Sequence, residues 1–341
     1  MFFKNDKNIP LIVAEIGQVH GGSLKKIFSF IDKCSSIGVD YVKFQMHYAD
    51  FESTYDEPFR KGFNFSENTR YHYWKKMEFN FKEWELIISK CKKKKIGFLC
   101  SPFSLEAYKI LKKLKVKIFK IGSGEFFSQD IIEHILRNKD SVILSTGLAN
   151  TKEIDTVVKK LLKNKNDLTL LQCTTKYPSD LKDVGLNVLT DFKKKYKCKI
   201  GLSDHTGNIA PALYCIFKEY DLLEVHITDN KEKMKRPDDS SSLTFDELKK
   251  VCDIKNNFLI MNKNKVNKDL VAKKLSYHKK IFTKSIALTK SIGKDQIIKK
   301  EYITFKKPGT GIPAKNIIKV IGKRAKKKLS PLRLVKLKDL Y

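Results

Sequence analysis

The sequence of 341 residues has no Cys-x-x-Cys pair, only six arginines, and no apolar run approaching the ~20 residues of a membrane span. Its seven cysteines stand singly, mostly in apolar segments, so we expect buried free thiols in place of disulfides or a zinc cluster. The first apolar run, at 10–17, alternates like a strand and no small-residue cleavage site follows it. These absences predict a cytoplasmic protein that does not cross a membrane.

What the sequence has in excess is lysine, which supplies most of a formal net charge of +31. A charge of this size raises the alternative of nucleic-acid binding, which would show as tight, salt-sensitive association. Proteins that read phosphates and bases favour arginine with interleaved aromatic residues, whereas these lysines occur in runs on the expected outer faces of helices. We therefore expect a solvated basic surface and no nucleic-acid partner.

Short β-branched runs alternate along the chain with amphipathic stretches of a dozen residues or more. Eight such units can be counted, which favours a closed (β/α)8 TIM barrel over an open sheet. The expected strands lie at 10–17, 40–46, 96–103, 116–124, 141–147, 168–175, 199–205 and 222–228. The long aromatic segment 47–80 is a candidate wall or lid of the cleft. We expect the barrel at 1–262, a lysine-rich linker at 263–280 and a small domain of short strands at 281–341.

In such barrels the reactive residues lie at the carboxyl ends of the strands, and nearly every expected strand here ends in polar groups. Lys43 and Lys120 in a barrel mouth need a counter-charge, which implies an anionic ligand; the alternative for Lys43 is a salt bridge to Glu15 or Glu125. Hydroxyl groups and glycine amides near the same ends could donate to a phosphate. The candidate hydroxyls belong to Ser123, Ser145 and Ser203.

Two histidines, His205 and His226, end adjacent strands and are candidate ligands for one divalent ion. The alternative for each is a structural histidine in the core. Glu15 then suits a base or a water-orienting group, and Glu125 and Asp238 suit sugar hydroxyls.

Several strings at these positions resemble the sialic acid synthase family of bacteria and animals, almost from end to end. The most specific are FKIGSGE at 119–125 and GLSDHTG at 201–207; others are AEIGQVHGGS at 14–23, QCTTKYP at 172–178, EVHIT at 224–228 and PDDSSSL at 237–243. The C-terminal segment from Ser285 to Pro313 resembles the antifreeze-like SAF domain of those enzymes. The resemblance implies a TIM barrel with a SAF domain, in a domain-swapped homodimer whose partner covers the sugar pocket.

The same resemblance implies condensation of phosphoenolpyruvate with N-acetylmannosamine or a related N-acyl hexosamine and water, with release of phosphate. It assigns phosphoenolpyruvate to Lys43, Lys120, Ser123, Ser145, Ser203 and Thr175. It assigns Mn²⁺ or Mg²⁺ to His205 and His226, and the attacking water to Glu15. It assigns the acylated sugar to Gln45, Glu125, Tyr177, Asp238 and, from the partner chain, Lys307. Catalysis would fall to Glu15, Lys120 and His226.

Four positions depart from the family pattern, mainly on the sugar side. Val19 replaces an Asn, Arg236 replaces a Gly before Pro237, Thr175 replaces an Asn, and Lys307 replaces an Arg. Because Arg236 stands two residues before Asp238, this change bears on the direction in which the Asp238 side chain points.

Two other readings remain open. The acceptor could be a 2,4-diacetamido-2,4,6-trideoxyhexose, giving legionaminic or pseudaminic acid. In a different class, the chain could be a non-catalytic barrel that binds a sugar or a partner, although a binder has no need of both a base and a metal.

Overall fold

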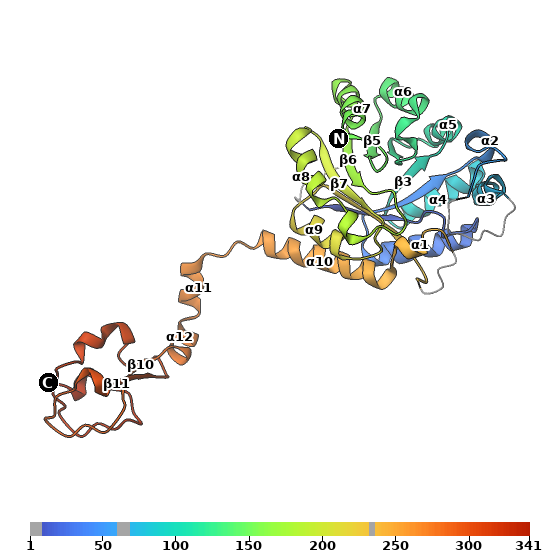
Figure 1. The fold of residues 1–341 in the computed structure, drawn as a ribbon. Helices are drawn as coiled ribbons and strands as arrows, with labels where there is room; N and C mark the ends of the chain where they lie inside the picture. Colours follow the sequence, from blue (N-terminus) through green and yellow to red (C-terminus); the bar gives the residue numbers. More distant parts are fainter. Residues whose placement is uncertain (1–8, 60–68, 232–235) are drawn as a thin grey trace. The chain divides into compact units, whose positions relative to one another are not determined.

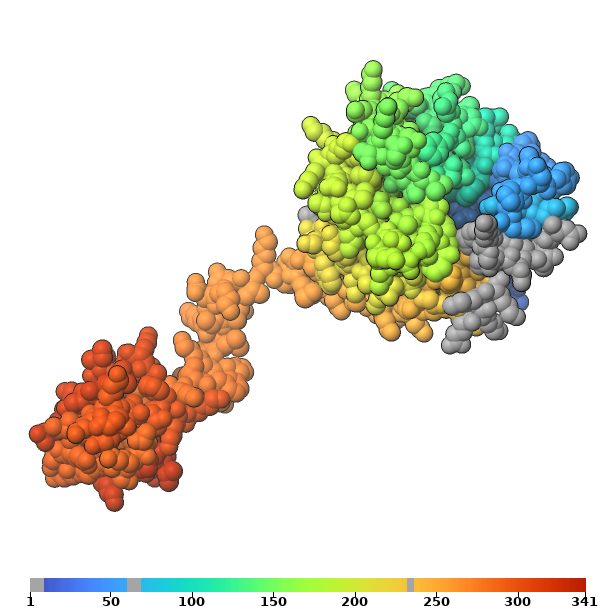
Figure 2. Space-filling view, in the orientation of Figure 1, coloured from blue at the N-terminus to red at the C-terminus, as the bar shows by residue number. Residues whose placement is uncertain are grey.

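The computed structural model describes residues 9–59, 69–231 and 236–341. Contacts within the chain divide it into a barrel unit, Met1–Lys263, and a C-terminal unit, Asn264–Tyr341. Each unit packs around a hydrophobic core of its own. Figures 1 and 2 draw both units, coloured along the sequence.

In the barrel unit, eight parallel strands pair in sequence order and β1 also pairs with β8, which closes the sheet (Figure 1). The strands are β1 (Leu11–Glu15), β2 (Tyr41–Met46), β3 (Gly97–Pro102), β4 (Ile118–Ile121), β5 (Ser141–Ser145), β6 (Leu168–Cys173), β7 (Lys199–Asp204) and β8 (Leu222–Thr228). A three-residue strand, β9 (Ser242–Thr244), lies beside β8. The predicted (β/α)8 barrel is confirmed.

Alternation along the strands separates the barrel interior from the surface that the helices cover. One interior layer is apolar and consists of Val13, Leu99, Ile143, Leu171 and Leu222. Two positions further along the same strands, where the side chain again points inward, stand Glu15, Ser101, Ser145, Cys173 and Glu224. The polar residues of the barrel mouth therefore rest on a buried apolar layer, which fixes the height at which they lie.

Helices surround the barrel and pack their apolar faces against the outward side chains of the strands. They are α1 (Leu24–Ile37), α4 (Phe81–Lys93), α5 (Leu105–Lys113), α6 (Gln129–Asn138), α7 (Thr151–Lys163), α8 (Leu186–Lys195), α9 (Ala210–Phe217) and α10 (Phe245–Lys263). Two further helices, α2 (Ala49–Glu52) and α3 (Arg70–Met77), pack against each other in a small cluster of their own. Capping boxes begin α4, with Asn80 and Glu83, and α7, with Asn150 and Glu153. Within the described ranges, no helix has both the length and the apolar character needed to cross a bilayer.

The C-terminal unit contains two short helices, α11 (Lys268–Lys274) and α12 (Ser276–Phe282), in the segment expected as a linker. An antiparallel pair of strands follows, β10 (Ser285–Leu288) and β11 (Ile303–Lys306), with several isolated bridges around it. Short 3-10 helices and irregular segments make up the rest of the unit, around a small core that includes Ile286, Ile298 and Val320.

Candidate active site

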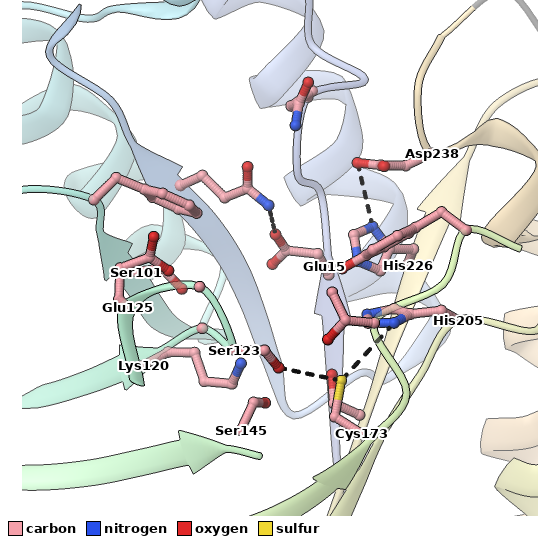
Figure 3. Close-up of a pocket in the computed structure, with 18 of the residues that line it drawn as sticks. Glu15, Ser101, Lys120, Ser123, Glu125, Ser145, Cys173, His205, His226 and Asp238 are labelled. Carbon is pink, nitrogen blue, oxygen red and sulfur yellow. Dashed lines mark hydrogen bonds and ion pairs between the residues drawn. The ribbon is translucent and has the colours of Figure 1, made fainter. Parts of the chain in front are cut away.

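The carboxyl ends of the barrel strands enclose a cavity of about 360 Å³, within the size range of small-molecule sites. All of the barrel residues predicted for the site line it (Figure 3). They are Glu15, Lys43, Gln45, Lys120, Ser123, Glu125, Ser145, Thr175, Tyr177, Ser203, His205, His226 and Asp238. Residues from seven of the eight predicted strand units, far apart in the sequence, thus meet in one cavity, along with others that the sequence did not single out.

Both candidate lysines are buried and face carboxylates at the bottom of the cavity. Lys43 Nζ lies 2.6 Å from Glu15 Oε2, so the alternative of an ion pair between these two residues is present. Glu224 lies between the lysines, with Oε1 3.7 Å from Lys43 Nζ and 3.3 Å from Lys120 Nζ. The lysines therefore have counter-charges in the chain itself, and their burial alone does not require an anionic ligand.

The two carboxylates of this cluster differ in their preference for a proton. Burial opposes ionisation of Glu224, but Lys120 and Lys43 outweigh it and lower the pKa of this carboxyl. For Glu15 burial dominates and raises the pKa, and the charge of Glu224 adds to the effect. Burial would lower the pKa of Lys43, yet Glu15 and Glu224 raise it. Glu224 is thus the fixed anion, and Glu15 is the carboxyl suited to exchange a proton.

Hydroxyl groups surround the lysines on the side of β4, β5 and β6. Ser145 Oγ and Thr175 Oγ1 are buried and make no hydrogen bond to the described residues. Ser123 Oγ accepts from the amide of Gly147 at 3.0 Å. A Cβ at residue 147 would lie 2.2 Å from Thr175 Oγ1 and 2.9 Å from Ser123 Oγ, so only glycine fits there. The unsatisfied hydroxyls are suited to donate to a ligand rich in oxygen.

The two candidate metal ligands, His205 and His226, lie side by side, with ring centroids 5.2 Å apart (Figure 3). His205 Nδ1 lies 2.9 Å from the carbonyl of Thr174, which can only accept, so Nδ1 carries a hydrogen and Nε2 is the nitrogen that could bind a metal in place of a proton. Burial would lower the pKa of His205, but Cys173 Sγ, 3.9 Å from Nδ1, and the Thr174 carbonyl raise it to about 9.

The donor set fits a divalent ion held by two imidazoles, with water and substrate in the other positions. The bond from His205 Nδ1 to a backbone carbonyl is the usual arrangement behind a metal-ligating histidine. Among the described residues, no cluster of three or more His, Cys, Asp or Glu side chains could hold a metal alone. A bound ion would therefore keep open positions, as catalytic ions do.

Asp238, whose aim was in doubt, points toward the imidazole pair. Its Oδ2 lies 3.7 Å from His226 Nδ1, and Tyr177 stacks against His205 with ring centroids 4.2 Å apart. Gly17, which has a positive φ of +51°, lets β1 turn close to these groups; a Cβ there would lie 3.3 Å from Asp238 Oδ2. Asp238 thus lies beside the proposed metal ligands and lines the cavity.

Arg236 explains how the changed loop after β8 is held. Its guanidinium donates to the carboxylates of Asp239 and Asp229 and to the backbone carbonyl of Val19, the last at 3.2 Å. Two of the departures noted in the sequence, Arg236 and Val19, are therefore in contact. They tie the loop that carries Asp238 to the segment that follows β1, although residues 232–235 of this loop lie outside the described ranges.

The described residues of the segment 47–80 form part of the cavity wall, as predicted. Residues 60–68 lie outside the described ranges. It contributes Glu52, Glu57, Arg70 and Trp74. Sequence reasoning did not single out these four, because nothing in a loop sequence indicates which side chains turn inward. Sequence reasoning gave no role to Glu224 either, although its spacing of two from His226 on one strand indicates the same face.

Lys307 belongs to the C-terminal unit, where its Nζ lies 5.5 Å from the ring centroid of Phe282. Its role toward a sugar therefore stays a prediction.

Comparison with known proteins agrees with the resemblance in the sequence. A family model described as the NeuB family matches residues 30–266. The chain is 32% identical to N,N'-diacetyllegionaminic acid synthase of Campylobacter jejuni, over 96% of this chain and 98% of that protein. It is 28% identical to pseudaminic acid synthase of the same species, over 95% and 94%. A solved structure, N-acetylneuraminic acid synthetase from Leptospira borgpetersenii, superposes with a TM-score of 0.67 at 28% identity and covers 80% of this chain and 92% of its own. The chain belongs to the NeuB family, as its resemblance to sialic acid synthases predicted.

Proposed function

We propose that this chain condenses phosphoenolpyruvate with an N-acyl amino hexose and water, to give a nine-carbon sialic-acid-type sugar and phosphate. The observation that carries the proposal is one cavity that joins two buried lysines, unsatisfied hydroxyls and a pair of imidazoles. A non-catalytic sugar-binding barrel would need the hydroxyls but not a proton-exchanging carboxyl between charged groups.

Phosphoenolpyruvate is assigned to the lysine end of the cavity. Lys43 and Lys120 would face its phosphate and carboxylate. The Lys120 ammonium keeps donors beyond its contact with Glu224, whereas that of Lys43 also contacts Glu15 and Ser101. The free hydroxyls of Ser145 and Thr175 add donors to the oxygens of the anion. Phosphoenolpyruvate then competes with Glu15 and Glu224 for the lysines.

The sugar is assigned to the opposite side, near Glu125, Tyr177 and Asp238. Gln45 contributes from β2, where its Nε2 donates to Glu15 Oε1 at 2.8 Å. Carboxylates and amide oxygens there accept hydrogen bonds from the hydroxyl and N–H groups of an amino sugar. The sugar reacts as its open-chain aldehyde.

A Mn²⁺ or Mg²⁺ ion held by His205 and His226 would supply a Lewis acid next to the aldehyde oxygen. The electron pair of the enol forms a bond from C3 of phosphoenolpyruvate to the aldehyde carbon, and the aldehyde oxygen takes a proton. Water then adds to the cationic C2 and gives a proton to Glu15, whose raised pKa suits this task. The bond from C2 to the bridging phosphate oxygen breaks, phosphate leaves with the electron pair and takes up the proton of the C2 hydroxyl, and C2 becomes the ketone carbon.

The acceptor has two candidates. The sequence predicts N-acetylmannosamine, whereas the 32% identity to N,N'-diacetyllegionaminic acid synthase favours a 2,4-diacetamido-2,4,6-trideoxyhexose. Phosphate release with each sugar in turn, at equal phosphoenolpyruvate, separates them. If the chain releases phosphate with neither sugar nor any related N-acyl hexosamine, the proposed function is wrong.

The C-terminal unit is assigned to a SAF-type cover that a second copy of the chain supplies, with Lys307 reaching the acyl group of the sugar. Apolar side chains along α11, α12 and the segments beside them support a second copy as their cover. Val266, Leu270, Tyr277 and Phe282 are 59% to 69% exposed in the single chain. Light scattering coupled to gel filtration should give the mass of a dimer, and a monomer at micromolar concentration would contradict the assignment.

A further inference from the structure

A row of hydrogen-bonded side chains runs from the cavity wall to the proposed base. Glu52 Oε1 lies 2.8 Å from His47 Nδ1, and His47 Nε2 lies 3.1 Å from Gln45 Oε1. Gln45 Nε2 in turn donates to Glu15 Oε1 at 2.8 Å. Four side chains, from β1, β2, α2 and the link between β2 and α2, are thus connected through successive contacts.

His47 is the centre of this row and is held rigidly. Its ring is 2% exposed and lies between Trp74, at a centroid distance of 4.1 Å, and Phe103, at 4.3 Å. The ring nitrogens face a carboxyl group on one side and the Gln45 oxygen on the other, and because a carbonyl oxygen can only accept, Nε2 carries a hydrogen and donates to Gln45.

The orientation of the Gln45 amide follows from its two neighbours. If the amide were reversed, its carbonyl oxygen would face the carboxylate of Glu15, and its NH₂ group would face the N–H of His47. Both contacts would then be repulsive. His47 therefore sets the Gln45 amide so that its NH₂ group is directed at Glu15, and this contact restrains the carboxyl that is assigned to the attacking water.

Glu52 stands at the end of the row that is furthest from Glu15. It lines the cavity, and its Oε2 is buried without a hydrogen bond to any described residue. Phosphoenolpyruvate offers only anionic acceptor oxygens, which a carboxylate repels. An amino sugar offers hydroxyl and N–H donors, which a buried carboxylate accepts strongly.

We infer that Glu52 is a further binding residue for the acceptor sugar, and that His47 is a positioning residue that links this contact, through Gln45, to Glu15. The inference rests on the proposed function, because it assigns an acceptor sugar to the cavity. It adds that binding of the sugar to Glu52 would restrain the position of Glu15 through His47 and Gln45.

The test compares His47→Phe with Tyr48→Phe in steady-state phosphate release. His47→Phe keeps an aromatic ring between Trp74 and Phe103 but removes both hydrogen bonds. Tyr48→Phe removes a neighbouring bond, to the Phe79 carbonyl at 3.2 Å, that does not belong to the row. We expect His47→Phe to lower kcat about 10- to 100-fold, with the KM for phosphoenolpyruvate unchanged, because a misplaced base slows chemistry more than donor binding. Tyr48→Phe should change kcat less than twofold.

A second arm uses Glu52→Gln, which has the same shape and can still accept from His47. It should raise the KM of the sugar about tenfold and leave the KM of phosphoenolpyruvate unchanged. A third arm introduces His47→Phe into Gln45→Leu. If His47 acts through Gln45, it adds less than about twofold to the loss in the double variant, whereas independent effects would multiply.

Turnover of the unmodified chain is measured first, and its absence counts against the proposed function. With an active parent, three outcomes overturn the present inference alone. They are a kcat of His47→Phe equal to that of Tyr48→Phe, multiplicative losses in the double variant, or an unchanged sugar KM in Glu52→Gln.

Discussion

The substitution Glu224→Gln removes a carboxylate that lies within 4 Å of both lysines of the site. The carboxylate is 2% exposed, with Oε1 3.7 Å from Lys43 Nζ, 3.3 Å from Lys120 Nζ and 3.1 Å from the Ser203 hydroxyl that donates to it. The amide keeps the shape and can still accept from Ser203. Lys120 then loses this counter-charge, and Lys43 keeps its ion pair with Glu15.

Removing one partner of a buried ion pair costs about 3–5 kcal/mol, because the remaining charge stays buried without compensation. We therefore expect the unfolding free energy of the barrel unit to fall by about 3–5 kcal/mol. Both tryptophans, Trp74 and Trp84, lie in the barrel unit, so their fluorescence during urea unfolding reports on that unit. Asp253→Asn is the matched control: its pair with Lys249 is exposed and screened by solvent, so the urea unfolding curve should stay that of the parent.

The same unfolding measurement can be repeated in the presence of phosphoenolpyruvate. If the lysines hold this anion, it should stabilise Glu224→Gln more than it stabilises the parent, since the variant has lost an internal competitor. A loss below about 1 kcal/mol would refute the central position of Glu224. Equal stabilisation of both proteins by phosphoenolpyruvate would refute the assignment of the lysines to this ligand.

Three further predictions concern other parts of the molecule. His226→Ala should abolish turnover and leave the unfolding free energy from urea titration within about 1 kcal/mol of the parent, because a strand-end ligand supports chemistry more than packing; retained activity removes it from the metal site. Burial lowers the pKa of His20 from about 6.5 to about 3, so only the unfolded chain takes up this proton between those values. Stability should then fall with decreasing pH below 6.5, by about 1.4 kcal/mol per unit from this residue, and His20→Gln should show a shallower fall in urea titrations at each pH. Lys307→Ala should raise the sugar KM with little effect on phosphoenolpyruvate, and the reverse result would contradict the cover assigned to the C-terminal unit.

Residues at the strand ends could be predicted because two regularities place them. Side chains alternate along a strand, and parallel strands of a closed barrel end on the same face, so Glu15, Lys43, Lys120 and His226 had to converge once the strands were recognised. The pairing of the charges could not be predicted in the same way. Whether Lys43 pairs with Glu15 or Glu125 depends on barrel register and side-chain reach, and only the coordinates give these.

The contacts that could not be predicted from the sequence are those made by loops. Arg236 reaches the carbonyl of Val19 across 217 positions of the chain, and no local pattern indicates that contact. The row from Glu52 to Glu15 likewise depends on the ring of His47 being turned between two aromatic side chains. Propensity and periodicity describe helices and strands, whereas these contacts arise from tertiary packing.

The assignment of phosphoenolpyruvate and the C–O cleavage are tested most directly with phosphoenolpyruvate labelled with ¹⁸O at the oxygen between C2 and phosphorus. The chain is mixed with this compound, Mn²⁺ and each acceptor sugar, and the released phosphate is analysed by mass spectrometry. We predict release only when a sugar is present, loss of release with a chelator, and the label in the inorganic phosphate. Release without sugar, or label retained in the organic product, would contradict the account.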